Sequence, residues 1–162
     1  FSFINDMVKK GLGEVAFLGV VILAIGNAVG RVVGGALSDK AGTKRTLIYM
    51  FSFQLILMIL SVFIANSDNN HPAVLLTIST LIGFAYGTNL AIFPSVTKEL
   101  YGLKNFGVNY GIMFAAWGLG GFVLSRVSQM LFTATESLAS SFITASVLLV
   151  IGLILIFTMK KA

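Results

Sequence analysis

The sequence contains no cysteine, so the chain forms no disulfide and has no thiol nucleophile. Its single histidine, His71, has no acidic or histidine partner at metal-ligand spacing, which argues against a metal site. Charged residues make up only 10% of the 162 residues, and 57% are hydrophobic. A soluble domain carries roughly a quarter charged residues. The chain cannot cover itself with polar surface, and we therefore expect a lipid bilayer to be its solvent.

Motifs of enzyme active sites are also missing. The sequence has no Ser/His/Asp set, no HExxH and no phosphate-cradling loop, since its "GLGG" lies inside an apolar segment. We therefore predict no enzyme and no cofactor. The net charge of +5 comes from basic residues placed between apolar runs rather than clustered on one face. This pattern favours orientation in a membrane over binding to nucleic acid.

Five apolar segments are long enough to cross a hydrocarbon core of about 30 Å, which takes about 20 helical residues. They are Val15–Leu37, Thr46–Ala65, Ala73–Phe93, Val108–Leu131 and Ser140–Met159. The only two prolines, Pro72 and Pro94, fall at segment edges, where helices tolerate them. Short links between spans place neighbours antiparallel in one bundle. The sequence thus predicts an all-α membrane protein in which residues 15–162 form a transmembrane bundle.

The basic residues alternate between the two sides of this bundle. The first and third links and the tail hold seven Lys or Arg, and the second and fourth links hold none. The basic side is expected to be cytoplasmic, so the C-terminus is placed there. Residues 1–14 then form an outer loop that begins with the last turn of a truncated helix. The chain is expected to be a multi-pass protein of the cell membrane.

Small residues recur at helical spacing in two of the segments. Gly26, Gly30 and Gly34 are four residues apart, and so are Gly83 and Gly87. Such ridges let helix backbones approach closely in lipid. We expect them to make a tightly packed bundle.

The link after the first span combines charge and glycine in a fixed pattern. It reads Gly35-x-x-x-Asp39-Lys40-x-Gly42-x-Lys44-Arg45. This pattern resembles the loop signature of the major facilitator superfamily of secondary transporters. An ordinary positive-inside loop would explain the lysines but not the Gly and Asp positions.

Each residue of this loop has an expected role. Gly35 would let the helix end lie against a neighbour, and Gly42 would permit a tight turn. Asp39 would face a helix N-terminus or a basic partner. The basic residues of the loop would pair with acids such as Glu99. The resemblance implies that the loop acts as a latch, closed in one access state and broken in the other.

Two further stretches, "GNAVGR" and residues 87–121, look like the oxalate/formate antiporter family. The resemblance implies that the chain is the C-terminal half of a twelve-helix carrier whose partner is an N-terminal six-helix half. It also implies a small carboxylate substrate and no bound cofactor.

Arg31 is the main candidate for substrate binding. It precedes Asp39 by eight residues, which places it about 12 Å into the membrane at 1.5 Å per residue. A charge near the midplane costs about 2.5–3.5 kcal/mol on insertion scales. A water-filled cavity and an anionic ligand would offset that cost, although the side chain is long enough to snorkel to the cytoplasm. Asn27, one turn earlier, is placed to orient the guanidinium or to touch the ligand.

An aromatic stripe is expected on the fourth span. Tyr110, Met113 or Phe114, and Trp117 fall on one face of a helix, where they form either a packing surface or part of the ligand site. Oxalate-exchanging members carry a lysine near the position of Trp117. Because a dianion is less well compensated without it, a monocarboxylate becomes the favoured substrate. Arg126 lies near the outer end of the span and is expected to snorkel outward.

The third span adds Tyr86 and Asn89 on a common face. Asn89 could hydrogen-bond a ligand or a neighbouring helix, and Gln54 in the second span is expected to join helices. The sequence thus predicts a secondary transporter that moves a mono- or dicarboxylate by alternating access, through exchange or proton coupling. A carrier for a sugar, nitrate or drug, or a non-transporting membrane sensor or scaffold, stays open.

Overall fold

The computed structural model describes residues 16–66 and 72–159, so the predicted outer segment 1–14 and His71 lie outside the described residues. The described part contains five α-helices and no strand. They are α2 (Ala16–Ala41), α3 (Thr43–Ala65), α4 (Pro72–Tyr101), α5 (Phe106–Thr135) and α6 (Ala139–Thr158). Each holds a stretch that is long and apolar enough to cross a membrane. The all-α membrane bundle predicted from the sequence is confirmed.

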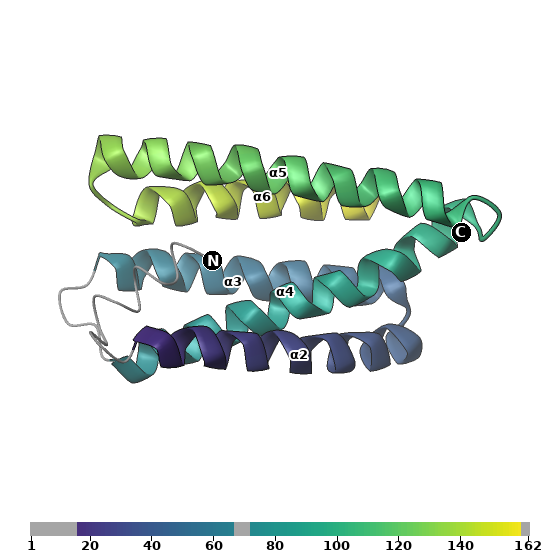
Figure 1. Ribbon diagram of the computed structural model, residues 1–162, viewed down its shortest axis with the longest axis horizontal. Coiled ribbons are helices and arrows are strands. Elements are labelled where there is room, and N and C mark those ends of the chain that lie inside the picture. The colour runs from purple at the N-terminus through teal and green to yellow at the C-terminus, as the bar shows by residue number, and fades with distance from the viewer. Residues whose placement is uncertain (1–15, 67–71, 160–162) are drawn as a thin grey trace.

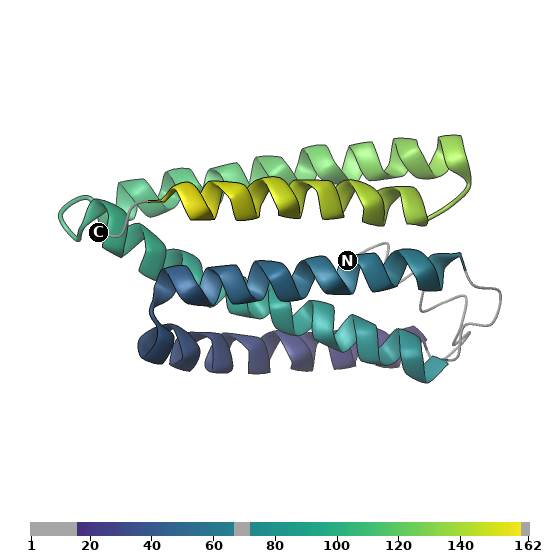
Figure 2. The ribbon, with the colours of Figure 1, turned by 180° about the vertical axis from the view of Figure 1, so that it is seen from behind.

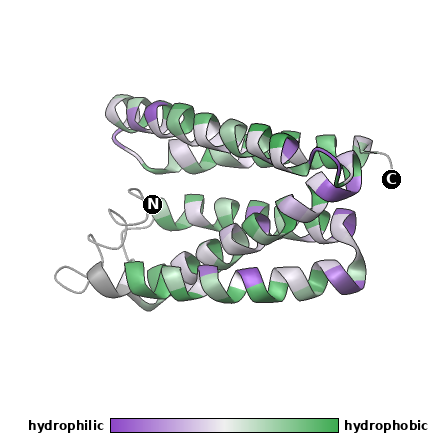
Figure 3. Cartoon of the chain, turned by 45° about the vertical axis from the view of Figure 1, so that its right-hand side comes forward, coloured by the Kyte–Doolittle hydropathy of each residue, from purple (hydrophilic) through white to green (hydrophobic). Residues whose placement is uncertain are grey.

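The helices run up and down beside one another (Figure 1). One end of the bundle holds the end of α2, the start of α3, the end of α4 and the start of α5. We call this the basic end, because five basic residues lie there: Lys40, Lys44, Arg45, Lys98 and Lys104. Figure 3 shows hydrophobic residues along most of each helix and strongly hydrophilic residues mainly near the ends.

Helix α3 lies between two helix pairs, α2 with α4 and α5 with α6 (Figures 1 and 2). Near the basic end, Leu47 of α3 packs with Ile92 and Val96 of α4 and Ile156 of α6. Toward the other end, a second cluster joins α3 to the start of α6. The apolar core of the described helices is therefore built around α3.

The closest packing is between α2 and α4, along the predicted glycine ridges. A Cβ atom added at Gly30 would lie 2.1 Å from the backbone oxygen of Phe84, and one at Gly87 would lie 2.0 Å from that of Asn27. The hydroxyl of Thr88 donates a hydrogen bond of 2.9 Å to the Gly30 carbonyl across the same contact. The small residues thus allow direct backbone contact between the two helices, as the spacing predicts.

The two glycines of the charged loop differ in role. Gly42 has a φ of +85°, which glycine adopts without steric cost, and it is the single residue between α2 and α3. The predicted tight turn is therefore confirmed. The close neighbour expected at Gly35 is absent from the described part of the chain, where a Cβ atom at this position would meet nothing within 4 Å.

Helix α4 is longer than the predicted span and passes through Pro94 to end at Tyr101. The expectation that Pro94 marks a helix edge is wrong. Pro94 has no N–H to donate and so leaves the carbonyl of Leu90 without its usual helical partner. Membrane helices tolerate this, since neighbouring groups and small local adjustments satisfy the freed carbonyl. The extra turns carry Glu99 to the basic end.

Helix α5 is packed differently from the others, because none of its residues is buried. Large apolar side chains such as Val108, Ile112, Leu119 and Phe122 are more than 60% exposed. Exposed apolar surface of this extent is incompatible with water and fits contact with lipid or with further protein.

Candidate functional site

Arg31 lies in the middle of α2, where the sequence places it. It is ten residues from the end of the membrane-length stretch Gly19–Ala41, or about 15 Å at 1.5 Å per residue. Its Nε donates a hydrogen bond of 3.1 Å to Oδ1 of Asn27, one turn earlier. The bond uses one of the five N–H donors of the guanidinium and orients it along α2.

The glycine contact between α2 and α4 brings Tyr86 to the same region. The backbone oxygen of Asn27 faces Gly87, the residue next to Tyr86. Arg31 is one turn after Asn27 on α2, so this contact places Tyr86 at about the level of Arg31. Trp117 of α5 completes the group, with its ring centroid 6.3 Å from that of Tyr86 and the two rings tilted by 40°. The structure thus brings together predicted site residues from three helices.

The predicted aromatic stripe on α5 is continuous. Tyr110 stacks on Phe106 with ring centroids 5.6 Å apart and also contacts Phe114 at 5.4 Å. Phe114 in turn contacts Trp117 at 5.1 Å. The stripe therefore runs from the start of α5 to the ring that faces Tyr86.

An apolar cavity lies between this stripe and α4. It has a volume of about 260 Å³. Its lining residues are Leu90, Phe93, Tyr110, Met113, Phe114, Ala116 and Trp117. Trp117 belongs to both groups, so the cavity adjoins the cluster of Arg31 and Tyr86.

Asn89 faces the neighbouring helix rather than this cluster. Its Nδ2 donates a hydrogen bond of 2.9 Å to Oε1 of Gln54 on α3. The contact between helices that the sequence predicts for Gln54 is thus present. The Oδ1 of Asn89 is buried and has no partner among the described residues.

Arg126 also lies apart from Arg31. Its guanidinium sits 5.7 Å above the ring of Phe122 on the same helix, and the side chain is exposed. Arg126 is nine residues from the end of α5, so the expected position near the outer end of the span is wrong. The cation–π contact with Phe122 partly shields its charge on a helix without buried residues.

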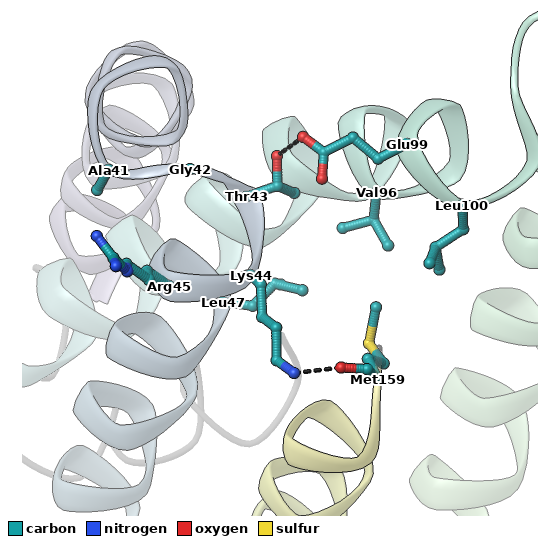
Figure 4. A pocket seen from close by; sticks show the side chains of 10 residues that line it. All are labelled: Ala41, Gly42, Thr43, Lys44, Arg45, Leu47, Val96, Glu99, Leu100 and Met159. Carbon is teal, nitrogen blue, oxygen red and sulfur yellow. Dashed lines mark hydrogen bonds between the residues drawn. The ribbon is translucent and has the colours of Figure 1, made fainter. Parts of the chain in front are cut away.

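At the basic end, the start of α3 is joined to two other helices (Figure 4). Thr43 donates a hydrogen bond to Glu99 of α4. Lys44 donates to the carbonyls of Phe157, at 3.3 Å, and Met159 at the end of α6. A pocket of about 380 Å³ lies between these contacts. A lysine at the C-terminus of a helix also interacts favourably with the helix dipole.

These contacts replace the ion pairs expected from the sequence. Asp39 is exposed and has no hydrogen-bond or ion-pair partner among residues 16–66 and 72–159. Glu99 bonds to a threonine rather than to a basic residue of the loop. The expected pairing of Lys44 with Glu99 is therefore wrong for this conformation, in which backbone carbonyls of α6 hold the lysine.

Sequence reasoning missed Thr88, Thr43 and the apolar cavity. Thr88 follows Gly87 and lies eight residues after Thr80, which contacts Gly26. This helical spacing places Thr88 on the face of α4 that meets α2, so the sequence could have predicted its contact. Thr43 carried no comparable signal, because its partner is 56 residues away. The cavity depends on how α4 and α5 diverge, which spacing along one helix does not specify.

Comparison with known proteins identifies the family. The model of the Major Facilitator Superfamily matches residues 2–162. The uncharacterized MFS-type transporter YhjX of Escherichia coli is 30% identical over 101 residues, covering 62% of this chain and 24% of the relative.

Two further relatives have names that state a substrate. The apicoplast pyruvate carrier 2 of Toxoplasma gondii is 30% identical over 72% of this chain and 16% of its own length. Human monocarboxylate transporter 14 is 27% identical over a stretch that covers 82% of this chain and 25% of the relative. The chain thus spans about a quarter or less of the length of these relatives. No solved structure gives a significant match. Because the family model covers nearly all of its length, the chain belongs to the Major Facilitator Superfamily.

Proposed function

We propose that the chain forms most of the C-terminal half of a carrier that moves a small organic anion, with a monocarboxylate favoured, by alternating access. The observation that carries the proposal is the position of Arg31: near the middle of a membrane-length helix, bonded to Asn27, and close to the contact between Asn27 and Gly87, the residue after Tyr86. A guanidinium there offers a fork of donors that matches a carboxylate in charge and geometry. Two relatives are named as a pyruvate carrier and a monocarboxylate transporter, which supports the same substrate class.

The N-terminal six-helix half would complete the site on the face that this chain leaves open. In transporters of this type the substrate binds near the midplane, between the two halves. The exposed apolar surface of α5 supports this arrangement, because such a surface has to be covered by the other half or by lipid. The carrier would reside in the cell membrane, work by exchange or proton coupling and need no cofactor. Membership of the oxalate/formate antiporter family stays the more specific proposal within this class, with a monocarboxylate favoured over oxalate.

Competition for uptake tests this proposal. The complete carrier is reconstituted in proteoliposomes loaded with unlabelled pyruvate, and uptake of labelled pyruvate is measured against excess acetate, formate, oxalate, glucose or nitrate. We expect the monocarboxylates to compete, oxalate to compete weakly and glucose not at all. Competition by glucose or nitrate alone would contradict the proposal.

The proposed orientation places the basic end in the cytoplasm. Lys104→Cys at this end should resist an impermeant thiol reagent added to intact cells, and Ala134→Cys at the other end should react. Both side chains are exposed and neither makes a hydrogen bond among the described residues, so folding should not change. The extent of labelling of each variant is compared with that of the parent carrier. The reverse pattern would show that the basic end faces outward.

The latch stays a prediction, assigned to Gly35, Asp39, Lys40, Gly42, Lys44 and Arg45 of the charged loop. Because Asp39 is exposed and unpartnered in this conformation, Asp39→Asn should change stability by no more than about 0.5 kcal/mol. If its carboxylate forms an ion pair in the other access state, exchange should slow several-fold at unchanged Tm. Glu136→Gln, which removes one exposed negative charge outside this loop, is the matched control. Normal exchange by Asp39→Asn would leave the loop as an orientation signal only.

A further inference from the structure

The apolar cavity adjoins the proposed anion anchor but differs from it in chemistry. Its seven lining residues are apolar apart from the Tyr110 hydroxyl and the Trp117 indole N–H, and none of them is Lys, Arg, Asp or Glu. It offers no cation to pair with a second carboxylate. Placing a second anionic group there would leave that group desolvated and unpaired, which is strongly unfavourable.

The cavity is connected to the anchor through two aromatic rings. Trp117 lines the cavity, and its ring centroid lies 6.3 Å from that of Tyr86. Gly87, the residue after Tyr86, meets the backbone of Asn27, whose side chain accepts the hydrogen bond from Arg31. A ligand held by its carboxylate at Arg31 can therefore pass its tail along Tyr86 and Trp117 to the cavity. Flat aromatic walls suit a planar tail, since offset-stacked and edge-to-face ring contacts are both favourable.

The size of the cavity limits the tail. An apolar cavity of about 150 Å³ is enough to bind benzene. The volume of about 260 Å³ between α4 and α5 therefore accepts a phenyl ring with a short linker. It is too small for most drug-sized ligands, whose sites run to about 300–1,000 Å³.

We propose that the cavity between α4 and α5 is a subsite for the apolar tail of the substrate, so that the carrier prefers a monocarboxylate with a short aromatic or branched aliphatic group over acetate or a dicarboxylate. This inference rests on the proposed function, because it takes Arg31 as the carboxylate anchor. It adds a selectivity that charge alone does not give. This selectivity comes from burying the apolar tail in the cavity. The methyl group of acetate buries less apolar surface and therefore gains less binding free energy.

The test uses phenylacetate and acetate as probes on the complete carrier. Protection against thermal unfolding is titrated with each acid, and the concentration for half-maximal protection is compared. We expect phenylacetate to be at least tenfold more potent than acetate, because its phenyl ring is buried in the cavity. Ala116→Leu fills the cavity and should reduce this preference below about threefold while leaving acetate unchanged.

Ala115→Leu is the matched control. Ala115 is the neighbouring residue on α5, is also exposed and does not line the cavity, so this variant should keep the full preference for phenylacetate. The control also separates binding in the cavity from partition of phenylacetate into lipid. Both variants lie on a helix without buried residues, and acetate protection reports whether each is folded.

The outcomes separate the two proposals. If acetate protects and phenylacetate is no more potent, the subsite is overturned while the anion carrier stands; a cavity filled by lipid or by the other half would give this result. If the preference survives Ala116→Leu, the tail binds elsewhere and the subsite is again overturned. If neither acid protects, the proposed function fails, and the subsite fails with it.

Discussion

Replacing Gly30 with alanine should separate α2 from α4 and destabilise the protein by about 3 kcal/mol or more. The new methyl group would lie 2.1 Å from the backbone oxygen of Phe84, far inside van der Waals contact. A backbone atom cannot move aside as a flexible side chain can, so the cost lies at or above the upper end of the usual range for overpacking. The same shift would break the hydrogen bond from Thr88 to the Gly30 carbonyl.

The measurement is thermal unfolding of the purified carrier, together with the fraction that elutes as a single folded species. Gly35→Ala is the matched control, because it lies on the same helix and its Cβ would meet nothing within 4 Å. This control should keep the parent Tm or raise it slightly, as alanine is the better helix former by about 1 kcal/mol. Equal Tm values for Gly30→Ala and Gly35→Ala would contradict the close α2–α4 contact.

This contact also determines the geometry of the candidate site. The backbone oxygen of Asn27 lies against Gly87, so the spacing between helices there sets how near Arg31 comes to Tyr86. A larger residue at position 87 would move α4 away and lengthen that distance. Helix packing and ligand geometry are thus coupled through the same small residues.

The features that sequence reasoning predicted well are those governed by spacing along one helix. Membrane-length apolar runs give the five helices, and the four-residue spacing of Gly26, Gly30 and Gly34 identifies the face that meets α4. The turn at Gly42 follows from a glycine in a very short link. The pairing of Asn27 with Arg31 likewise spans one helical turn.

The features that it missed depend on the relative placement of different helices. Pro94 reads as a helix end, but the surrounding bundle continues α4 for seven more residues. The partner of Glu99 is decided by which side chain of α3 lies opposite, and that residue is Thr43 rather than a lysine. Periodicity alone identifies the face of a helix, and the packed structure is needed to identify its neighbour.

Replacing Arg31 with glutamine should weaken carboxylate binding by at least about 30-fold, since truncating one member of a desolvated charge pair costs about 2–5 kcal/mol. The variant should insert and fold at least as well as the parent, because the cost of an arginine at mid-membrane depth is removed. Arg31→Lys keeps the charge but loses the planar fork and the bond from Nε to Asn27. We expect it to bind about 3- to 10-fold more weakly, between the parent and Arg31→Gln.

Protection against thermal unfolding by pyruvate, titrated for each variant of the complete carrier, measures these losses. Arg126→Gln is the matched control, because it removes the same charge from α5 at a similar depth, where the guanidinium lies over the Phe122 ring; both arginines are exposed in the described chain. Its protection by pyruvate should equal that of the parent. A loss shared by both variants would indicate a general effect of net charge, and undiminished protection of Arg31→Gln would show that Arg31 serves the packing of α2 rather than the substrate. A loss confined to Arg31 would assign the carboxylate to this side chain, which combines a position near the middle of α2, a hydrogen bond to Asn27 and the nearby α2–α4 contact at Gly87.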